Sequence, residues 1–193
     1  MTLIDENAFG VLIAHYDLES LEYNMAPEVF IEYLGRFSRL VEERISLSPL
    51  ATSLRKVELG HAYYLEFADG DQLIDPITWV RETRKTFVAA DLPNVCVLSE
   101  GGRWLDEPPI DGATAAEPSQ DPRHICFGPS EPLRKALAAE SLAQPTTAKE
   151  PEEVGFGPGL YVEKDAIERL GKSLKNVPTA LPVLSSVFYR IGT

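Results

Sequence analysis

The chain has 193 residues, of which 44% are hydrophobic and 25% are charged. This length and composition are typical of one soluble globular domain with a substantial core, so we expect residues 1–193 to form a single domain. The excess of acidic side chains gives a formal net charge of -12. Such a negative field repels phosphate backbones and anionic lipids, which argues against binding to nucleic acid or to a membrane surface.

The N-terminal residues MTLIDENAFG lack the basic and apolar segments of a signal peptide, and no apolar run in the chain is long enough to cross a bilayer. We therefore expect a cytoplasmic protein. The two cysteines, Cys96 and Cys126, are too few for a disulfide framework or a metal cluster. We expect both to be free thiols within strands.

The first half of the chain predicts a strand, a helix and a hairpin. Residues 9–16, FGVLIAHY, form a nearly continuous apolar run, as expected for a central strand covered on both faces. A helix is predicted from Pro27 to Ile45, because apolar residues recur there at spacings of three and four. Residues 54–67 are interrupted by Gly60, which can adopt the positive φ of a tight turn, so we expect two antiparallel strands.

The middle of the chain predicts a helix, a strand and a loop. A second helix begins at Pro76, and the next strand is expected from Asn94 to Leu105. Residues 106–122 contain four prolines, no aromatic residue and no hydrophobic period. This composition is typical of a mobile loop, since it cannot bury enough apolar surface to become ordered.

The last third of the chain predicts two further helices between strands. Residues 124–145, HICFGPSEPLRKALAAESLAQP, combine a short apolar strand, a Gly-Pro pair and an Ala-rich helix. A strand is expected over residues 159–163 and a short helix over residues 165–170, which stops before a glycine. The closing strand is expected over residues 184–191.

Three glycines precede the strand at residues 159–163. Gly155, Gly157 and Gly159 imitate the spacing of a phosphate-binding loop. They lead into a strand instead of opening a helix, so they lack the helix N-terminus on which such loops rely.

The order of these elements and several short motifs resemble the class III nucleotidyl cyclase domain. In that family an apolar strand and a glycine lead into a helix that ends in Leu-Glu-Ser-like residues, as residues 124–145 do. The segments GPGLYVEKDAIERLG and SSVFYRI are similar to its late strand, helix and closing strand. The resemblance covers nearly the whole chain. It implies an α+β fold, a ferredoxin-like sandwich with a mostly antiparallel sheet and helices packed on it.

The resemblance also implies a metal site. The family holds two divalent metals with one carboxylate at the end of the first strand and another in the Gly-Asp turn of the hairpin. Asp17 stands at the first place, but the hairpin dipeptide here is Gly60-His61. Magnesium prefers anionic oxygen ligands, and imidazole is a poor replacement. We therefore expect no cofactor unless Asp17 binds a divalent metal.

Two other interpretations of these residues stay open. Asp17 equally fits a polar residue that ends a strand in a turn. Imidazole suits zinc or copper, so a different metal held by Asp17, His61 and His15 is the second interpretation. His15 and Asp17 alternate with Tyr16 on the first strand, so we expect them to share one face.

The other catalytic residues that the resemblance implies are not found. The family carries an Asn and an Arg four residues apart on the helix after the glycine. One register places Pro132 and Ala136 at these positions, and the other places Arg134 and Ala138. Lys56 lies about one residue out of step with the base-selecting lysine, and Arg134 can contact a phosphate or form a solvated face.

We therefore predict a non-catalytic cyclase-like domain that acts as a regulatory or binding module. The alternative is a diverged metal-dependent enzyme acting on nucleotides, and a purely structural role is a third interpretation. Asp17, His61, Lys56 and Arg134 are the candidate ligand-binding residues, for a nucleotide or a protein partner. The family pairs its domains partly through the region that corresponds to residues 103–123. A single domain would expose one apolar face, so we expect a homodimer.

Overall fold

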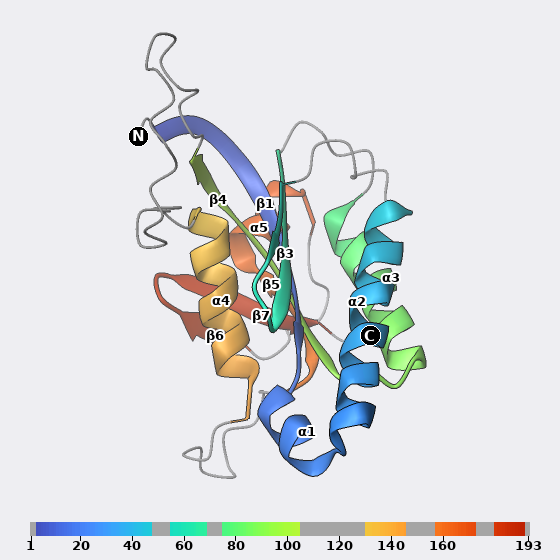
Figure 1. Cartoon of the computed structure of the whole chain (residues 1–193). Helices are drawn as coiled ribbons and strands as arrows, with labels where there is room; N and C mark the ends of the chain where they lie inside the picture. The colour runs from blue at the N-terminus through green and yellow to red at the C-terminus, as the bar shows by residue number, and fades with distance from the viewer. Residues whose placement is uncertain are drawn as a thin grey trace, which may run out of the picture.

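A computed structural model describes residues 3–47, 55–68, 75–104, 130–145, 157–172 and 180–191. These residues form one seven-stranded sheet in the order β2-β3-β1-β4-β5-β7-β6, with helices on both faces (Figure 1). The strands are β1 (Leu3–His15), β2 (Arg55–Glu58), β3 (Ala62–Ala68), β4 (Asn94–Trp104), β5 (Gly159–Glu163), β6 (Ala180–Val183) and β7 (Ser186–Ile191). The helices are α1 (Leu18–Asn24), α2 (Pro27–Ser46), α3 (Pro76–Ala89), α4 (Glu131–Ala143) and α5 (Lys164–Arg169).

The sheet is antiparallel except for the pairing of β4 with β5, which is parallel. This arrangement confirms the predicted α+β fold with a mostly antiparallel sheet. β1 lies at its centre, paired with β3 on one side and β4 on the other. Residues 8–15 of this strand are buried, as the continuous apolar run predicts.

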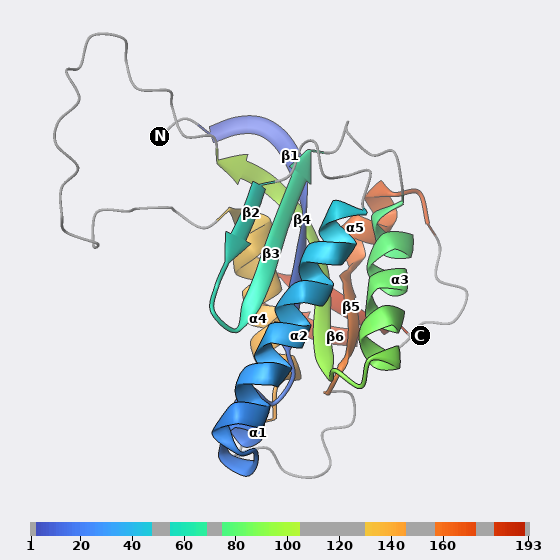
Figure 2. The same cartoon turned by 45° about the vertical axis from the view of Figure 1, so that its right-hand side comes forward.

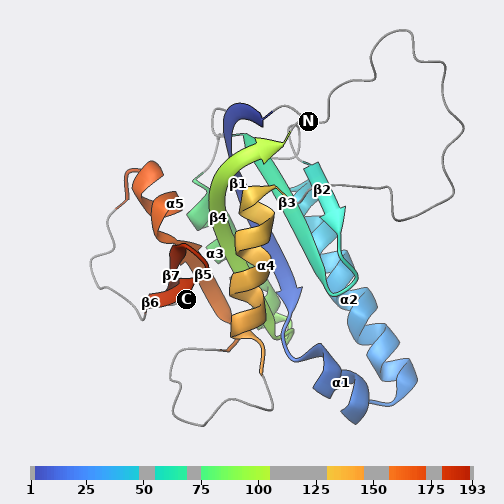
Figure 3. The same ribbon diagram turned by 90° about the vertical axis from the view of Figure 1, so that its left-hand side faces the viewer.

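Two hydrophobic layers enclose the sheet. On one face α2 and α3 lie side by side, and Phe37 and Phe87 pack their rings at a centroid distance of 4.7 Å (Figure 2). On the other face α4 crosses the sheet and packs its small residues Ala136, Ala139 and Ala143 against β1 and its neighbours (Figure 3). α4 therefore reaches the end of β1 from the face opposite α2.

The structure differs from the predicted elements in two places. The closing strand is a hairpin, since Leu184 adopts a left-handed conformation (φ 55°) between β6 and β7. The sequence pattern missed α1 because this short helix buries none of its residues and so carries no apolar period. The predicted loop at 106–122 and the short apolar strand predicted before Gly128 lie outside the described residues. Among those that are described, no helix has the length and apolar character needed to cross a bilayer.

Candidate functional site

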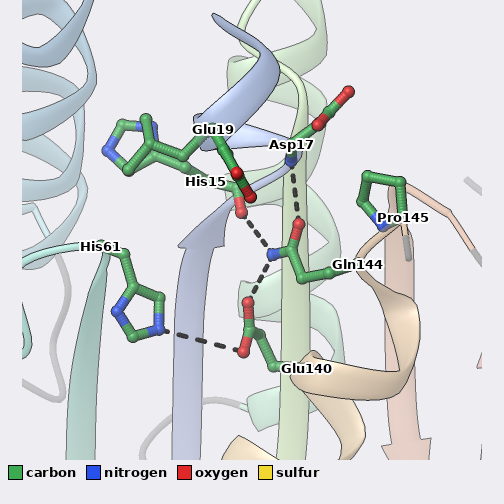
Figure 4. A pocket seen from close by; sticks show the side chains of 8 residues that line it. His15, Asp17, Glu19, His61, Glu140, Gln144 and Pro145 are labelled. Carbon is green, nitrogen blue, oxygen red and sulfur yellow. Dashed lines mark hydrogen bonds and ion pairs between the residues drawn. The ribbon is translucent and has the colours of Figure 1, made fainter. Parts of the chain in front are cut away.

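A cavity of about 230 Å³ lies at the end of β1, between the turn that joins β2 to β3 and the C-terminal end of α4 (Figure 4). Its lining residues are His15, Asp17, Leu18, Glu19, His61, Glu140, Gln144 and Pro145. Two of the four candidate ligand-binding residues from the sequence, Asp17 and His61, are therefore brought together here.

The backbone holds the two sequence segments side by side. The backbone N–H of His15 donates to the carbonyl of His61 at 3.1 Å, which joins the end of β1 to the hairpin turn. Gly60 has a φ of 77° in that turn, as its position in the sequence predicts. The N–H of Leu59 donates to the carbonyl of Ala62 at 2.8 Å and closes the turn.

Gln144 connects the last turn of α4 to the end of β1. Its Oε1 accepts a hydrogen bond from the backbone N–H of Asp17 at 2.8 Å. Its Nε2 donates to the carbonyl of His15 at 2.7 Å and also to the carboxylate of Glu140 (Figure 4). Glu140 and Gln144 are four residues apart, so they lie on the same side of the helix.

The backbone of Asp17 turns out of the strand. Asp17 has φ 54° and ψ 43°, a left-handed conformation that Asp tolerates better than most residues. The alternation expected for His15 and Asp17 is therefore wrong, because β1 ends at His15. The carboxylate of Asp17 makes no capping hydrogen bond to α1 and points away from His61 and Glu140 (Figure 4).

His15 is a packing residue. It is 3% exposed, and its ring stacks on Phe37 with 3.6 Å between ring centroids. Its Nδ1 lies 3.4 Å from the hydroxyl of Tyr33. Burial, and then the nearby His61, lower the pKa of His15 to about 4, so its imidazole is neutral at neutral pH. The neutral ring belongs to the core beneath α2.

His61 faces a carboxylate that the sequence patterns do not identify. Its Nε2 lies 3.9 Å from Oε2 of Glu140, and its side chain is 45% exposed while that of Glu140 is 7% exposed. Together with Asp17 and Glu19, this gives the cavity three acidic side chains and one exposed imidazole. Even so, no group of three or more His, Cys, Asp or Glu side chains among the described residues forms a metal-binding arrangement.

Lys56 and Arg134 lie elsewhere. Lys56 pairs with Glu42 of α2, and its Nζ lies 5.5 Å from the centroid of the Tyr63 ring. Arg134 is exposed near the N-terminal end of α4, whereas Gln144 caps the opposite end of this helix. Neither residue lines the cavity.

The positions expected for the catalytic Asn and Arg also lack the required donors. Pro132 and Ala136 are buried against the sheet, and Ala138 packs as a partly buried apolar residue. Arg134 alone carries a guanidinium, and it is exposed. Neither register of α4 supplies the pair.

Comparison with known proteins identifies the fold. No protein-family model and no curated protein matches the sequence. The structure is similar to that of the adenylyl cyclase CyaB from P. aeruginosa, with a TM-score of 0.55 and 9% identity over 100% of this chain and 97% of that chain.

It is also similar to the dimeric guanylyl cyclase domain of the RhoGC fusion protein from the aquatic fungus Blastocladiella emersonii. That match has a TM-score of 0.53 and 12% identity over 95% of this chain and 92% of that chain. Both matches cover nearly whole chains, and they agree with the element order predicted from the sequence. The chain therefore has the fold of the class III nucleotidyl cyclase domain.

Proposed function

We propose that this domain is non-catalytic and acts as a regulatory or binding module. The observation that carries the proposal is the environment of His61. This residue stands where the resembled family has its second metal-binding carboxylate, and its imidazole faces Glu140 at 3.9 Å. Cyclisation of a nucleoside triphosphate needs divalent metals to neutralise phosphate charge and to activate the hydroxyl. One carboxylate of the family's pair, Asp17, is left.

The charge of the cavity supports the same proposal. Its described lining includes Asp17, Glu19 and Glu140 but no Lys or Arg. A triphosphate would meet carboxylates without a compensating cation from these residues, and the net charge of -12 adds to the repulsion. The described part of α4 contributes Glu140 and Gln144 to the site instead of the donors that stabilise a developing phosphate charge.

A homodimer is the form in which we propose that the module works. The RhoGC guanylyl cyclase domain, which shares this fold, is dimeric. A paired arrangement would cover exposed apolar side chains such as Val29 and Ile31 of α2, and two-fold pairing is the commonest closed symmetry. A nucleotide or another protein is the proposed ligand of such a dimer.

Restoring the missing carboxylate tests the proposal. Electron paramagnetic resonance of free Mn²⁺ measures metal binding by the wild type and by His61→Asp, with His61→Asn as the neutral control. We expect the wild type and His61→Asn to bind Mn²⁺ equally weakly. His61→Asp should bind at least about tenfold more tightly, since it supplies a second anionic oxygen ligand.

The opposite result would favour the enzyme alternative. If the wild type binds Mn²⁺ as tightly as His61→Asp does, and Asp17→Ala removes this binding, then Asp17 holds a divalent metal with His61 in place. The proposal of a non-catalytic site would then be wrong.

A further inference from the structure

A second polar cluster lies at the start of β5, outside the cavity. Arg84 of α3 and Arg190 of β7 both direct a guanidinium at the carbonyl of Pro158, with Nη2–O distances of 3.5 Å and 2.9 Å. Arg190 is paired with Tyr161 in the sheet, and Tyr161 packs on the face covered by α4. Arg84 comes from the face covered by α3, so the two cations meet at the end of the sheet.

The guanidinium of Arg84 is buried and poorly satisfied. Arg84 is 9% exposed, and its Nε and Nη1 are buried without a hydrogen-bond partner among the described residues. Burial lowers the pKa of Arg84, and the neighbouring positive charge of Arg190 lowers it further. No carboxylate among the described residues acts on Arg84. A buried cation beside a second cation is costly unless an anion accompanies them.

The backbone at the start of β5 is shaped around Arg190. A Cβ on Gly159 would lie 2.9 Å from Nε of Arg190, so the glycine lets this side chain lie across the strand. Gly157 has a φ of 134°, and its carbonyl accepts a hydrogen bond from the hydroxyl of Tyr161 at 2.7 Å. A Cβ on Gly157 would lie 3.9 Å from the hydroxyl of Tyr16 and 4.0 Å from Nη2 of Arg190. Gly159, which does not belong to a phosphate-binding loop, thus makes room for a cation.

We propose that Arg84 and Arg190 together bind a small anion through carboxylate or phosphate oxygen atoms. Such oxygens accept hydrogen bonds from guanidinium N–H groups, and these charge-assisted bonds are among the strongest in proteins. An anion beside the two guanidinium groups would neutralise the repulsion between the two arginines. The net charge of -12 favours a small anion over a polyanion.

This inference is independent of the proposal that the domain is non-catalytic, because neither arginine lines the cavity. The test is thermal unfolding of the full chain at constant ionic strength, with inorganic phosphate or sodium acetate replacing sodium chloride. At about a hundred times the dissociation constant, the midpoint should rise by roughly 5–10 °C. The rise should saturate with concentration.

Matched variants separate binding from general salt effects. Phosphate stabilises proteins without binding, because it is excluded from their surface. Arg39→Gln removes an exposed cation from α2 and should respond to phosphate as the wild type does. Arg190→Gln and Arg84→Met should lose the saturating part of the rise. A response to acetate instead of phosphate would support the same site with a carboxylate ligand.

The stability of Arg84→Met also shows whether the charge of Arg84 is unpaired or whether its hydrogen bond to the carbonyl of Pro158 stabilises the fold. In phosphate-free buffer its midpoint should equal or exceed that of the wild type, because a buried cation without a partner has been removed. Equal saturating responses of the wild type and Arg190→Gln would overturn the proposal, as would no response in the wild type.

Discussion

Burial separates the residues at the end of β1 that can bind a ligand from those that pack in the core, and His15 is the clearest example. Its position two residues before Asp17 is compatible with a ligand role, but its ring is 3% exposed and packs on Phe37. A buried imidazole without a carboxylate partner loses its proton more easily than one in water. Packing therefore removes His15 from the set of candidate ligands.

The first prediction concerns the pH dependence of stability. The unfolded chain binds a proton at His15 near pH 6.5, whereas the folded chain does so only near pH 4. The free energy of unfolding should therefore fall as the pH falls from 6.5 to 4, by up to roughly 3 kcal/mol from this residue. Urea unfolding of the wild type and of His15→Phe at pH 4 to 7 measures the difference in slope.

His61→Gln is the comparison variant, and it should weaken the slope only slightly, because burial lowers the pKa of His15 more than the nearby His61 does. Parallel curves for the wild type and His15→Phe would show that the imidazole titrates in the folded state as it does in water.

Part of the candidate site could be predicted from the sequence, and the geometry explains why its other residues could not. The resemblance to the cyclase domain implies that Asp17 and His61 lie near each other, because they stand at the family's two metal-binding positions. The direction of the Asp17 carboxylate was not predictable, since a left-handed residue breaks the alternation of a strand. Gln144 was missed because its partner Asp17 is 127 residues away in the chain. The spacing of four residues between Glu140 and Gln144 was the one signal in the sequence that could have identified Gln144 as a site residue.

At the level of elements, close packing places α4 on β1. Gly10 lies under the first turn of α4, where a Cβ would come within 2.6 Å of the Tyr64 hydroxyl and 2.8 Å of Cβ of Pro132. The backbone of β1 can approach the helix because this residue has no side chain.

The second prediction follows from this contact. Gly10→Ala should lower the free energy of unfolding by about 1–3 kcal/mol, because the added methyl group overpacks the interface. Gly35→Ala is the matched control, since nothing lies within 4 Å of its Cβ position in α2. It should raise stability by about 0.5–1 kcal/mol. Chemical denaturation of both variants checks the signs, and a neutral Gly10→Ala would show that α4 does not approach β1 this closely.

α4 is also held by a buried ion network at its N-terminal end. Nζ of Lys135 lies 2.8 Å from a carboxylate oxygen of Glu163, which is fully buried, and 3.2 Å from one of Glu131. It also donates to the carbonyl of Glu100 at 2.9 Å. Burial lowers the pKa of Lys135, but the carboxylates of Glu163 and Glu131 outweigh burial and raise it.

The third prediction is the cost of breaking this network. Lys135→Met should destabilise the protein by about 3–5 kcal/mol, because Glu163 would be left as a buried charge without its partner. Lys164→Met breaks an exposed pair with Glu168 and should change stability by no more than about 0.5 kcal/mol. Similar losses for both variants would mean that solvent reaches Glu163.

Most described elements could be predicted from the sequence, because their apolar periods are strong and their ends carry Pro or Gly. β5 and the starts of α2, α3 and β4 lie where the pattern placed them. β1 begins earlier than expected, since the polar residues at 5–7 interrupt its apolar run, and Leu3 and Ile4 pair with β4 before a register shift between Ile4 and Asn7. The turn between β6 and β7 gave no Gly or Pro signal, because Leu184 adopts the positive φ.

At the scale of the whole molecule, charge opposes self-association and apolar surface favours it. Each copy carries a formal charge of -12, so two copies repel each other at low salt. Repulsion between exposed charges is screened beyond a Debye length of about 8 Å at physiological salt.

The fourth prediction is therefore a homodimer whose stability rises with salt. Light scattering at several protein concentrations should give a dimer mass at high salt, with more monomer at low salt. A monomer mass at high protein concentration in both salts would contradict the prediction. An unrelated partner would then be proposed to cover the exposed apolar side chains Val29 and Ile31 of α2.

A search for cyclic nucleotide tests most directly whether the domain is non-catalytic. The full chain is incubated with ATP or GTP and with Mg²⁺ or Mn²⁺, and cyclic nucleotide is measured by mass spectrometry beside the Asp17→Ala variant. We predict no cyclic nucleotide above the level formed without protein, because His61 stands where the resembled family has a metal-binding carboxylate and α4 lacks the Asn and Arg pair that the resemblance implies. Cyclic nucleotide that forms with the wild type and disappears with Asp17→Ala would contradict the account.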